Sequence, residues 1–163
     1  MKAKLKFIMD GGEVTRYHTT RTIQDESVGH HSFGVAMYCY LLCRPSANLL
    51  IAALVHDLAE HMTGDSPAPA KKELGIGDMV NALEERLLTE VGFNIALTES
   101  EKRTLKLADI FQGMAFCVRE LQMGNKNMDA IFWRYATYAK ERHPYGDELI
   151  LYNTIMEIYN ECK

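Results

Sequence analysis

Residues 51–65 read Ile-Ala-Ala-Leu-Val-His-Asp-Leu-Ala-Glu-His-Met-Thr-Gly-Asp, an apolar stretch that ends in a cluster of ionisable side chains. The first five residues are all apolar, and a helix that is apolar on every side belongs in a protein interior. His56, Asp57, Glu60 and His61 then follow within six positions. Burying such groups is costly unless a partner or a metal ion satisfies them. The stretch therefore predicts a core helix that leads into a functional site.

The spacing of these side chains suits a shared ion. In a helix, His56 and Asp57 would diverge by about 100°, and Glu60 would lie on the same side as both. His61 is five residues beyond His56, so this is not the H-E-x-x-H zinc helix, whose two histidines stand four residues apart. Two ligands do not complete a metal site. Further ligands must therefore come from elsewhere in the chain.

The composition predicts one soluble domain that spans residues 1–163. A chain of this length can bury a sizeable core, and 47% hydrophobic with 25% charged residues is ordinary for a globular protein. The net charge of -4 provides no basic excess, which argues against a nucleic-acid polymer as partner. The four cysteines form no C-x-x-C pair, which favours a reducing, cytoplasmic setting. No apolar run is long enough to predict a membrane span.

Hydrophobic periodicity predicts helices along most of the chain and no β-strand. Besides the core helix, apolar residues recur at helical spacing over residues 30–42, 77–91, 100–122, 126–142 and 146–161. Residues 1–12 predict a short amphipathic turn or helix. The prolines within residues 63–72 predict a loop. We therefore expect an all-α bundle of about six helices.

Two other positions supply metal ligands of the same kind. His31 lies in the first turn of the helix expected after the polar N-terminal loop, and Asp109 lies in the most apolar part of the long helix. A lone aspartate in such a run should be neutral, paired or metal-bound. Together with His56 and Asp57 they offer two imidazoles and two carboxylates. That set suits Mn²⁺, Co²⁺, Fe²⁺ or Zn²⁺ with open positions for water.

The order His31, His56-Asp57, Asp109 resembles the H…HD…D signature of the HD-domain phosphohydrolases. Further motifs resemble the 5′-deoxynucleotidase branch of that family, and they are Arg16-Tyr17, His31-Ser32, residues 56–71 (HDLAEHMTGDSPAPAK) and Lys106-Leu107-Ala108-Asp109. The trailing T-G-D-x-P-x-P-x-K pattern is specific, whereas H and HD alone are a loose signal. The chain is also similar to the small phage dATP triphosphohydrolases. The resemblance implies a single-domain HD-type helical bundle and a metal-dependent hydrolase.

The resemblance also implies a role for each matching residue. The metal ligands would be His31, His56, Asp57 and Asp109, around one Co, Mn, Zn or Fe ion, with a second ion, Mg²⁺, as an option at the phosphates. Glu60 would orient or deprotonate the attacking water, and Asp65 is a second candidate for the proton transfer.

The substrate would be held by neighbouring residues. Arg16, Lys71 and Lys106 would contact phosphate, where cationic groups stabilise the charge of the transition state. Tyr17 stands where this branch usually carries Trp near the sugar and base. The smaller ring, with its hydroxyl group, leaves the sugar preference open.

These residues are compatible with two functions. The first is hydrolysis of a deoxynucleotide, either a dNMP by a 5′-deoxynucleotidase or a dNTP by a triphosphohydrolase such as a dATPase. The second is a catalytically idle HD fold that binds a nucleotide as a regulator. Retention of all four ligands and of Glu60 argues against the second, because an idle site does not need a water-activating carboxylate. The resemblance further implies a homo-oligomer, a dimer or hexamer, in the cytoplasm of a bacterium or of a phage-infected host cell.

Overall fold

The computed structural model shows a helical chain arranged around one long central helix. It describes residues 1–162, apart from the side chain of Ala68. Lys163, where the predicted domain ends, and the Ala68 side chain of the T-G-D-x-P-x-P-x-K motif therefore lie outside the described residues. Residues 1–162 contain no β-strand, and a single isolated bridge joins Thr15 and Ser27. The predicted all-α fold is confirmed. Within that part of the chain no helix has the length and apolar character of a membrane span.

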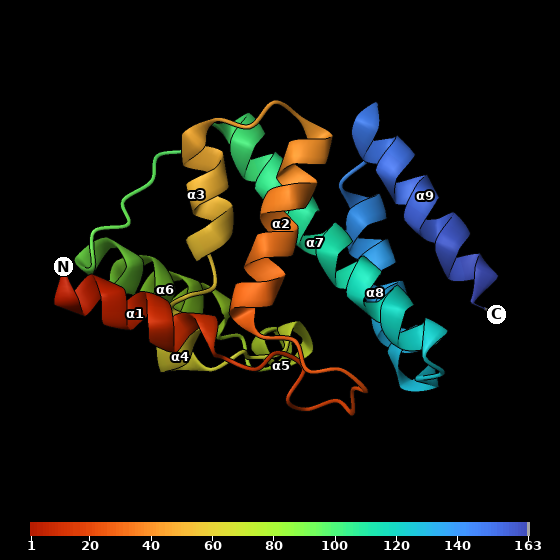
Figure 1. Ribbon diagram of the computed structural model, residues 1–163, viewed down its shortest axis with the longest axis horizontal. Helices are drawn as coiled ribbons and strands as arrows, with labels where there is room; N and C mark the ends of the chain where they lie inside the picture. The colour runs from red at the N-terminus through yellow and green to blue at the C-terminus, as the bar shows by residue number, and fades with distance from the viewer. Residues whose placement is uncertain (163) are drawn as a thin grey trace.

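The helices follow one another with short connections (Figure 1). In chain order they are α1 (Lys2–Gly12), α2 (Val28–Leu42), α3 (Ala47–Val55), α4 (Glu60–Thr63), α5 (Ala68–Glu73), α6 (Gly77–Glu90), α7 (Glu99–Gln122), the 3-10 helix η1 (Lys126–Met128), α8 (Asp129–Glu141) and α9 (Asp147–Glu161). They outnumber the six or so that were predicted. The additional helices α4, α5 and η1 have four, six and three residues, too short for hydrophobic periodicity to reveal them.

The central helix is α7, which is 24 residues long. In Figure 1 it runs behind α2 through the middle of the molecule, with α3 and α6 towards the N-terminal side and α8 and α9 towards the C-terminal side. Its middle is buried, and Phe111, Met114 and Phe116 form a core with Phe132 of α8 and Tyr159 of α9. A capping box joins Thr98 to Glu101 at its N-terminus. The helix thereby carries Asp109 into the interior of the bundle.

Two parts of the chain differ from their predicted structure. The prolines of residues 63–72 were expected to exclude a helix, but α5 begins at Ala68 with Pro69 in its first turn. Proline is tolerated there because the first backbone N–H groups of a helix have no acceptor within the helix. The core helix was expected to include His56, but α3 ends at Val55 and tight turns lead from there into α4. His56 and Glu60 therefore do not lie on one side of a single continuous helix, as the sequence had predicted.

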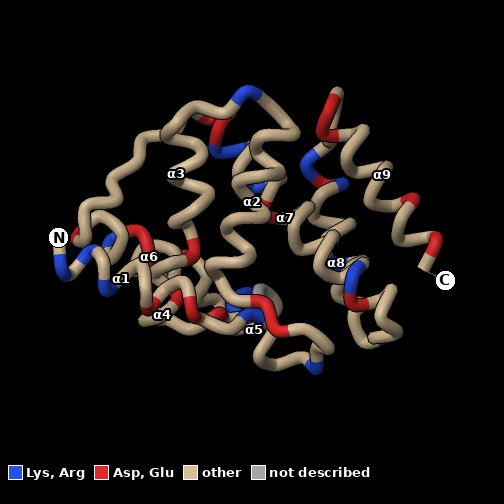
Figure 2. Tube along the Cα trace, viewed as in Figure 1, with Lys and Arg blue, Asp and Glu red and all other residues tan. Residues whose placement is uncertain are grey.

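The helix α2 packs against α1, α3, α7 and α9. It carries no Lys, Arg, Asp or Glu from Val28 to Leu42 (Figure 2). Ser27 caps its first turn by accepting a hydrogen bond from the backbone of His30. This cap sets the start of α2, so that His31 falls in the first turn and faces the interior, where it is fully buried.

Candidate metal centre

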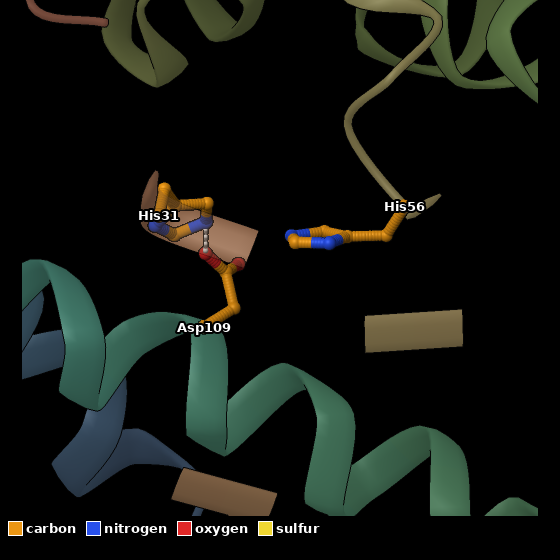
Figure 3. A group of neighbouring side chains, drawn as sticks. All are labelled: His31, His56 and Asp109. Atoms are coloured by element: carbon orange, nitrogen blue, oxygen red, sulfur yellow. Dashed lines mark ion pairs between the residues drawn. The ribbon is translucent and has the colours of Figure 1, made fainter. Parts of the chain in front are cut away.

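Three of the predicted ligands meet at the centre of the bundle. His31 comes from α2, His56 follows the last residue of α3, and Asp109 comes from the middle of α7. One nitrogen or oxygen from each lies within 4.8 Å of the others (Figure 3). The Nε2 atom of His31 is 3.3 Å from Oδ1 of Asp109. This group of three could hold a metal ion.

The fourth predicted ligand, Asp57, adjoins this group. Its Oδ2 atom lies 3.5 Å from Nε2 of His31, and its Oδ1 atom lies 3.3 Å from Nε2 of His56. Oδ2 also accepts a hydrogen bond of 2.8 Å from Nη1 of Arg16. Oδ2 of Asp57 therefore contacts the imidazole of His31 and the guanidinium of Arg16, while Oδ1 faces His56.

The chemistry of the donor atoms fits a divalent cation. Nδ1 of His56 lies 2.9 Å from the carbonyl oxygen of Ala53. A carbonyl only accepts, so Nδ1 carries the proton and Nε2 keeps its lone pair. The Nε2 atoms of both His31 and His56 are buried, without a hydrogen-bond partner among the described residues. Buried polar atoms without partners are costly, and a metal ion would satisfy both.

The electrostatics keep the site in the form that binds metal. Burial alone would raise the pKa of Asp109, but Lys106, 2.7 Å from Oδ2 of Asp109, and the nearby imidazoles hold it well below its usual value. Burial likewise opposes the charge of Asp57, yet His56 and Arg16 lower its pKa. Burial lowers the pKa of His56. Ionised carboxylates and a neutral imidazole are the states that metal binding requires.

The two candidates for proton transfer have different surroundings. Glu60 is the first residue of α4 and is buried, with Oε2 unpartnered among the described residues. Burial first, and then Asp57 and Asp65, raise the pKa of Glu60 to about 9. Asp65 instead accepts a hydrogen bond of 2.9 Å from the backbone N–H of Tyr17. Asp65 therefore also supports the loop that carries Tyr17.

The loop before α2 brings two predicted substrate residues towards the centre. Arg16 is buried, and it lies between Asp57 and Glu26. Tyr17 has a φ of 57°, which is uncommon for a residue with a side chain. Its ring stacks on Phe116 at a centroid distance of 4.7 Å. Its hydroxyl lies 3.1 Å from the hydroxyl of Tyr135.

The predicted phosphate-binding lysines lie on two different helices. Lys106 lies next to Asp109 on α7. Lys71 of α5 is instead directed towards α6, where its Nζ lies 3.8 Å from Oε1 of Glu84. That oxygen also accepts a hydrogen bond from Thr63. Of the two lysines, Lys106 is thus the one in direct contact with the metal group.

Two open pockets adjoin the metal group. The smaller, of about 210 Å³, is lined by His56, Asp57, Lys102, Leu105, Lys106 and Asp109. The larger, of about 270 Å³, shares His56 and Leu105 with it and extends over α6 and residues 93–95, where its lining includes the acidic residues Glu84 and Glu85. Solvent and small molecules therefore reach the metal group, with ammonium groups on the wall of the smaller pocket.

Three residues at the site were not predicted from the sequence. Gln112 of α7 contacts His31, Glu26 contacts Gln112 and Arg16, and Tyr135 contacts Tyr17. Gln112 had a signal, because it is polar within an apolar run and stands three residues after Asp109 on the same helix face. Glu26 lies in a polar stretch and Tyr135 on an amphipathic helix, where neither side chain is distinctive.

Comparison with known proteins identifies the family. A model described as the HD domain matches residues 12–145. The chain belongs to the HD domain family. This HD-domain chain is 27% identical over 138 residues to a 5′-deoxynucleotidase of Citrobacter koseri, covering 69% of each chain. It is 25% identical over 154 residues to a 4′-phosphooxetanocin A phosphatase of Priestia megaterium, covering 80% of this chain and 79% of that relative.

Solved structures share the fold of the HD-domain chain. A protein of Pyrococcus horikoshii OT3 superimposes with a TM-score of 0.77 at 22% identity and covers 100% of both chains. The HD phosphohydrolase of cyanophage S-2L, bound to dA and one catalytic Zn²⁺ ion, superimposes with a TM-score of 0.61 at 19% identity, covering 96% of this chain and 94% of that one. The family and its curated relatives make this chain a 5′-deoxynucleotidase-like, metal-dependent phosphohydrolase, as its motifs predicted.

Proposed function

We propose that the chain hydrolyses deoxynucleoside 5′-phosphates, with water attacking a phosphoryl group at a metal centre held by His31, His56, Asp57 and Asp109. One observation carries the proposal. Two buried imidazole nitrogens with free lone pairs face a carboxylate that pairs with an ammonium group. Such a site can bind both a divalent cation and an anionic phosphate. The similarity to the 5′-deoxynucleotidase of Citrobacter koseri supports the substrate class.

A bound divalent ion would lower the pKa of a water molecule and polarise the phosphoryl group. Zn²⁺ is supported by the cyanophage phosphohydrolase, which shares the fold and holds one catalytic Zn²⁺ ion. Co²⁺, Mn²⁺ and Fe²⁺ suit the same donors. A second ion, Mg²⁺, stays an option at the phosphates. Titration of the metal-free protein with each ion distinguishes among them.

The residues around the metal group would share the remaining work. Glu60 would act on the attacking water. In its protonated form Glu60 would orient the water, and once nearby positive charge favours the ionised carboxylate, Glu60 would deprotonate the water. Asp65 is the alternative for proton transfer to the leaving oxygen. Arg16, Lys106 and Lys71 would hold the phosphoryl oxygens. Tyr17 would contact the sugar and base.

The monophosphate is the favoured substrate, because the curated relatives named above are a 5′-deoxynucleotidase and a phosphatase. A dNTP is the second candidate. Lys102 lies beside Lys106 on the wall of the smaller pocket, and this additional cation supports a longer phosphate chain.

The decisive experiment measures hydrolysis of a panel of dNMPs and dNTPs, with matching ribonucleotides, in the presence of Mn²⁺, Co²⁺ or Zn²⁺ and with chelator. Resolving phosphate from triphosphate among the products identifies the bond that breaks. We expect His56→Ala to abolish turnover. His30→Ala is the matched control, because His30 neighbours a ligand in sequence but is exposed, and it should retain wild-type turnover. Tight nucleotide binding without turnover by the wild-type protein would favour the regulatory alternative.

We also propose that the chain assembles as a homo-oligomer, a dimer or hexamer. The uncharged helix α2 exposes Phe33, Met37, Tyr40 and Leu41, and a contiguous exposed apolar surface is typical of association sites. Light scattering coupled to gel filtration tests this. The cytoplasm of a bacterium, or of a phage-infected host cell, is the proposed location, and the four free cysteines suit its reducing conditions.

A further inference from the structure

We infer that Gln112 is a positioning residue for the metal ligand His31, and that Glu26 holds Gln112 in its working orientation. The inference deepens the proposed function and rests on it, since it takes His31 to be a metal ligand. It concerns two buried side chains to which the resemblance assigns no role.

Three buried side chains form a continuous chain of hydrogen bonds that ends at the metal group. Nε2 of Gln112 lies 2.6 Å from Oε1 of Glu26, and Oε1 of Gln112 lies 2.5 Å from Nδ1 of His31. Glu26, Gln112 and His31 are 1%, 4% and 0% exposed. The three side chains are therefore shielded from bulk water. The three residues come from the loop before α2, from α7 and from α2.

The order of donors and acceptors follows from the chemistry of the end group. The amide nitrogen of Gln112 only donates, and its acceptor is Oε1 of Glu26. The amide oxygen of Gln112 then has to face His31, where it accepts the proton of Nδ1. With Nδ1 protonated, the lone pair of the imidazole lies on Nε2. Nε2 is the atom that lies 3.3 Å from Asp109 and has no hydrogen-bond partner within residues 1–162.

Glu26 also reaches the opposite side of the metal group. Its Oε2 atom lies 3.4 Å from Nε of Arg16, and Nη1 of Arg16 donates to Asp57. One carboxylate thus orients a histidine through Gln112 and a guanidinium directly. A carboxylate that only stabilised the core would not need contacts with both Gln112 and Arg16, which reach the metal group from two sides.

Space for Gln112 is left by a glycine. A Cβ atom at position 34 would lie 2.8 Å from Cγ of Gln112 and 3.4 Å from its Nε2 atom. Gly34 is in the interior of α2, where glycine costs roughly 0.5–1 kcal/mol relative to alanine. Glycine at position 34 therefore lowers helix stability, but an alanine there would push Gln112 away from Glu26 and His31.

The test compares wild type with Gln112→Met, which keeps the approximate shape and removes the amide. The first readout is the tautomer of His31 in the metal-free protein, from long-range ¹H–¹⁵N spectra at about pH 8, above the ordinary imidazole pKa. The wild type should show a protonated Nδ1, and the variant should lose that preference. The second readout is Zn²⁺ or Co²⁺ affinity by calorimetry, which should fall by roughly 10–100-fold.

Two further variants separate positioning from packing. Val118→Ala removes a buried apolar group from the same helix, so it should lower stability while the His31 tautomer and the metal affinity stay at wild-type values. Gly34→Ala keeps every polar group and should weaken metal binding by displacing Gln112. It also provides the test if Gln112→Met fails to fold.

The inference is overturned if His31 keeps its Nδ1–H tautomer in Gln112→Met and Gly34→Ala, or if metal affinity stays within twofold of wild type in both. Failure of the proposed function is a separate outcome. A wild-type protein that hydrolyses no deoxynucleotide would refute that function, while the tautomer and metal-affinity readouts would still report on Gln112.

Discussion

His56 and His61 make the same local contact and have different surroundings. Each has Nδ1 within hydrogen-bond distance of the carbonyl oxygen three residues earlier, at 2.9 and 2.8 Å. The ring of His56 lies 5.3 Å from that of His31, whereas His61 packs edge-on against Phe7. His61 is thus a packed histidine. Local hydrogen bonding orients an imidazole, but its neighbours across the fold decide its role.

Glu60 gives a prediction about pH. Its pKa is raised from 4.5 to about 9 in the folded, metal-free chain. A carboxyl group whose pKa is raised on folding contributes stability that is present below the unfolded pKa and is lost as the pH rises through the folded value. The metal-free protein should therefore lose stability between about pH 4.5 and 9, and Glu60→Gln should remove that loss.

Urea denaturation of the metal-free proteins at several pH values between about 4.5 and 9 checks this. The two proteins should be equally stable at the acidic end, and Glu60→Gln should be more stable by at least about 1 kcal/mol near pH 8, since one pKa unit corresponds to about 1.4 kcal/mol. Glu73→Gln, at an exposed position of α5, should follow the wild-type curve. Parallel curves for wild type and Glu60→Gln would contradict the prediction.

Helix α7 depends on its N-terminal cap. Thr98 accepts a hydrogen bond from the backbone of Glu101 and donates one to its carboxylate. Thr98→Ala should lower the free energy of unfolding by about 1 kcal/mol. Metal affinity should stay within twofold of wild type, because Asp109 lies about three turns further along the helix. Urea unfolding and metal titration measure the two effects, with Ser100→Ala as an exposed control. A large fall in metal affinity would show that the cap sets the position of Asp109.

The contact between α7 and α8 depends on Gly113. A Cβ atom there would lie 2.6 Å from Cζ of Tyr135, whose hydroxyl meets that of Tyr17. Alanine gains roughly 0.5–1 kcal/mol over glycine in a helix, but overpacking a core costs about 1–3 kcal/mol. Gly113→Ala should therefore be destabilising on balance and should raise the KM for the deoxynucleotide.

Thermal unfolding and steady-state kinetics test Gly113→Ala. Gly12→Ala is its control, because among the described residues no heavy atom outside the local backbone lies within 4 Å of a Cβ at that position. The control should be at least as stable as wild type, because Gly12 belongs to α1 and alanine favours a helix over glycine, and it should keep the wild-type KM. A Gly113→Ala protein as stable as wild type would contradict the prediction, because it would mean that α8 shifts to accommodate the added methyl group without a loss of stability.

The whole fold is coupled to the metal centre, because its candidate ligands come from α2, from the turn after α3 and from α7. An ion that binds only the folded state stabilises it by about 2.7 kcal/mol at a concentration about 100 times its Kd. We expect Zn²⁺ or Mn²⁺ to raise the Tm of the wild type. The rise should be absent in His31→Ala and retained in His30→Ala. An equal rise in all three proteins would place the bound ion elsewhere.

Sequence patterns predicted the features that depend on local physics. Helical periodicity and helix caps depend on residues only a few positions apart in sequence, so the long helices and the all-α class were predicted correctly. The prediction was wrong where local rules have exceptions. The prolines of residues 63–72 permit α5 because Pro69 is in its first turn. The core helix stops before His56, and the apolar pattern does not mark that end.

By itself, the sequence determined the class of fold and the kinds of side chain available to bind a metal. The tertiary structure alone decided which of them meet. His31 and Gln112 are 81 residues apart in sequence, and Gln112 and Glu26 are 86 apart. Hydrogen bonds of this separation depend on how helices pack, and packing is a property of the whole core. No local pattern contains it, and so the partners that orient His31 became visible only in the folded chain.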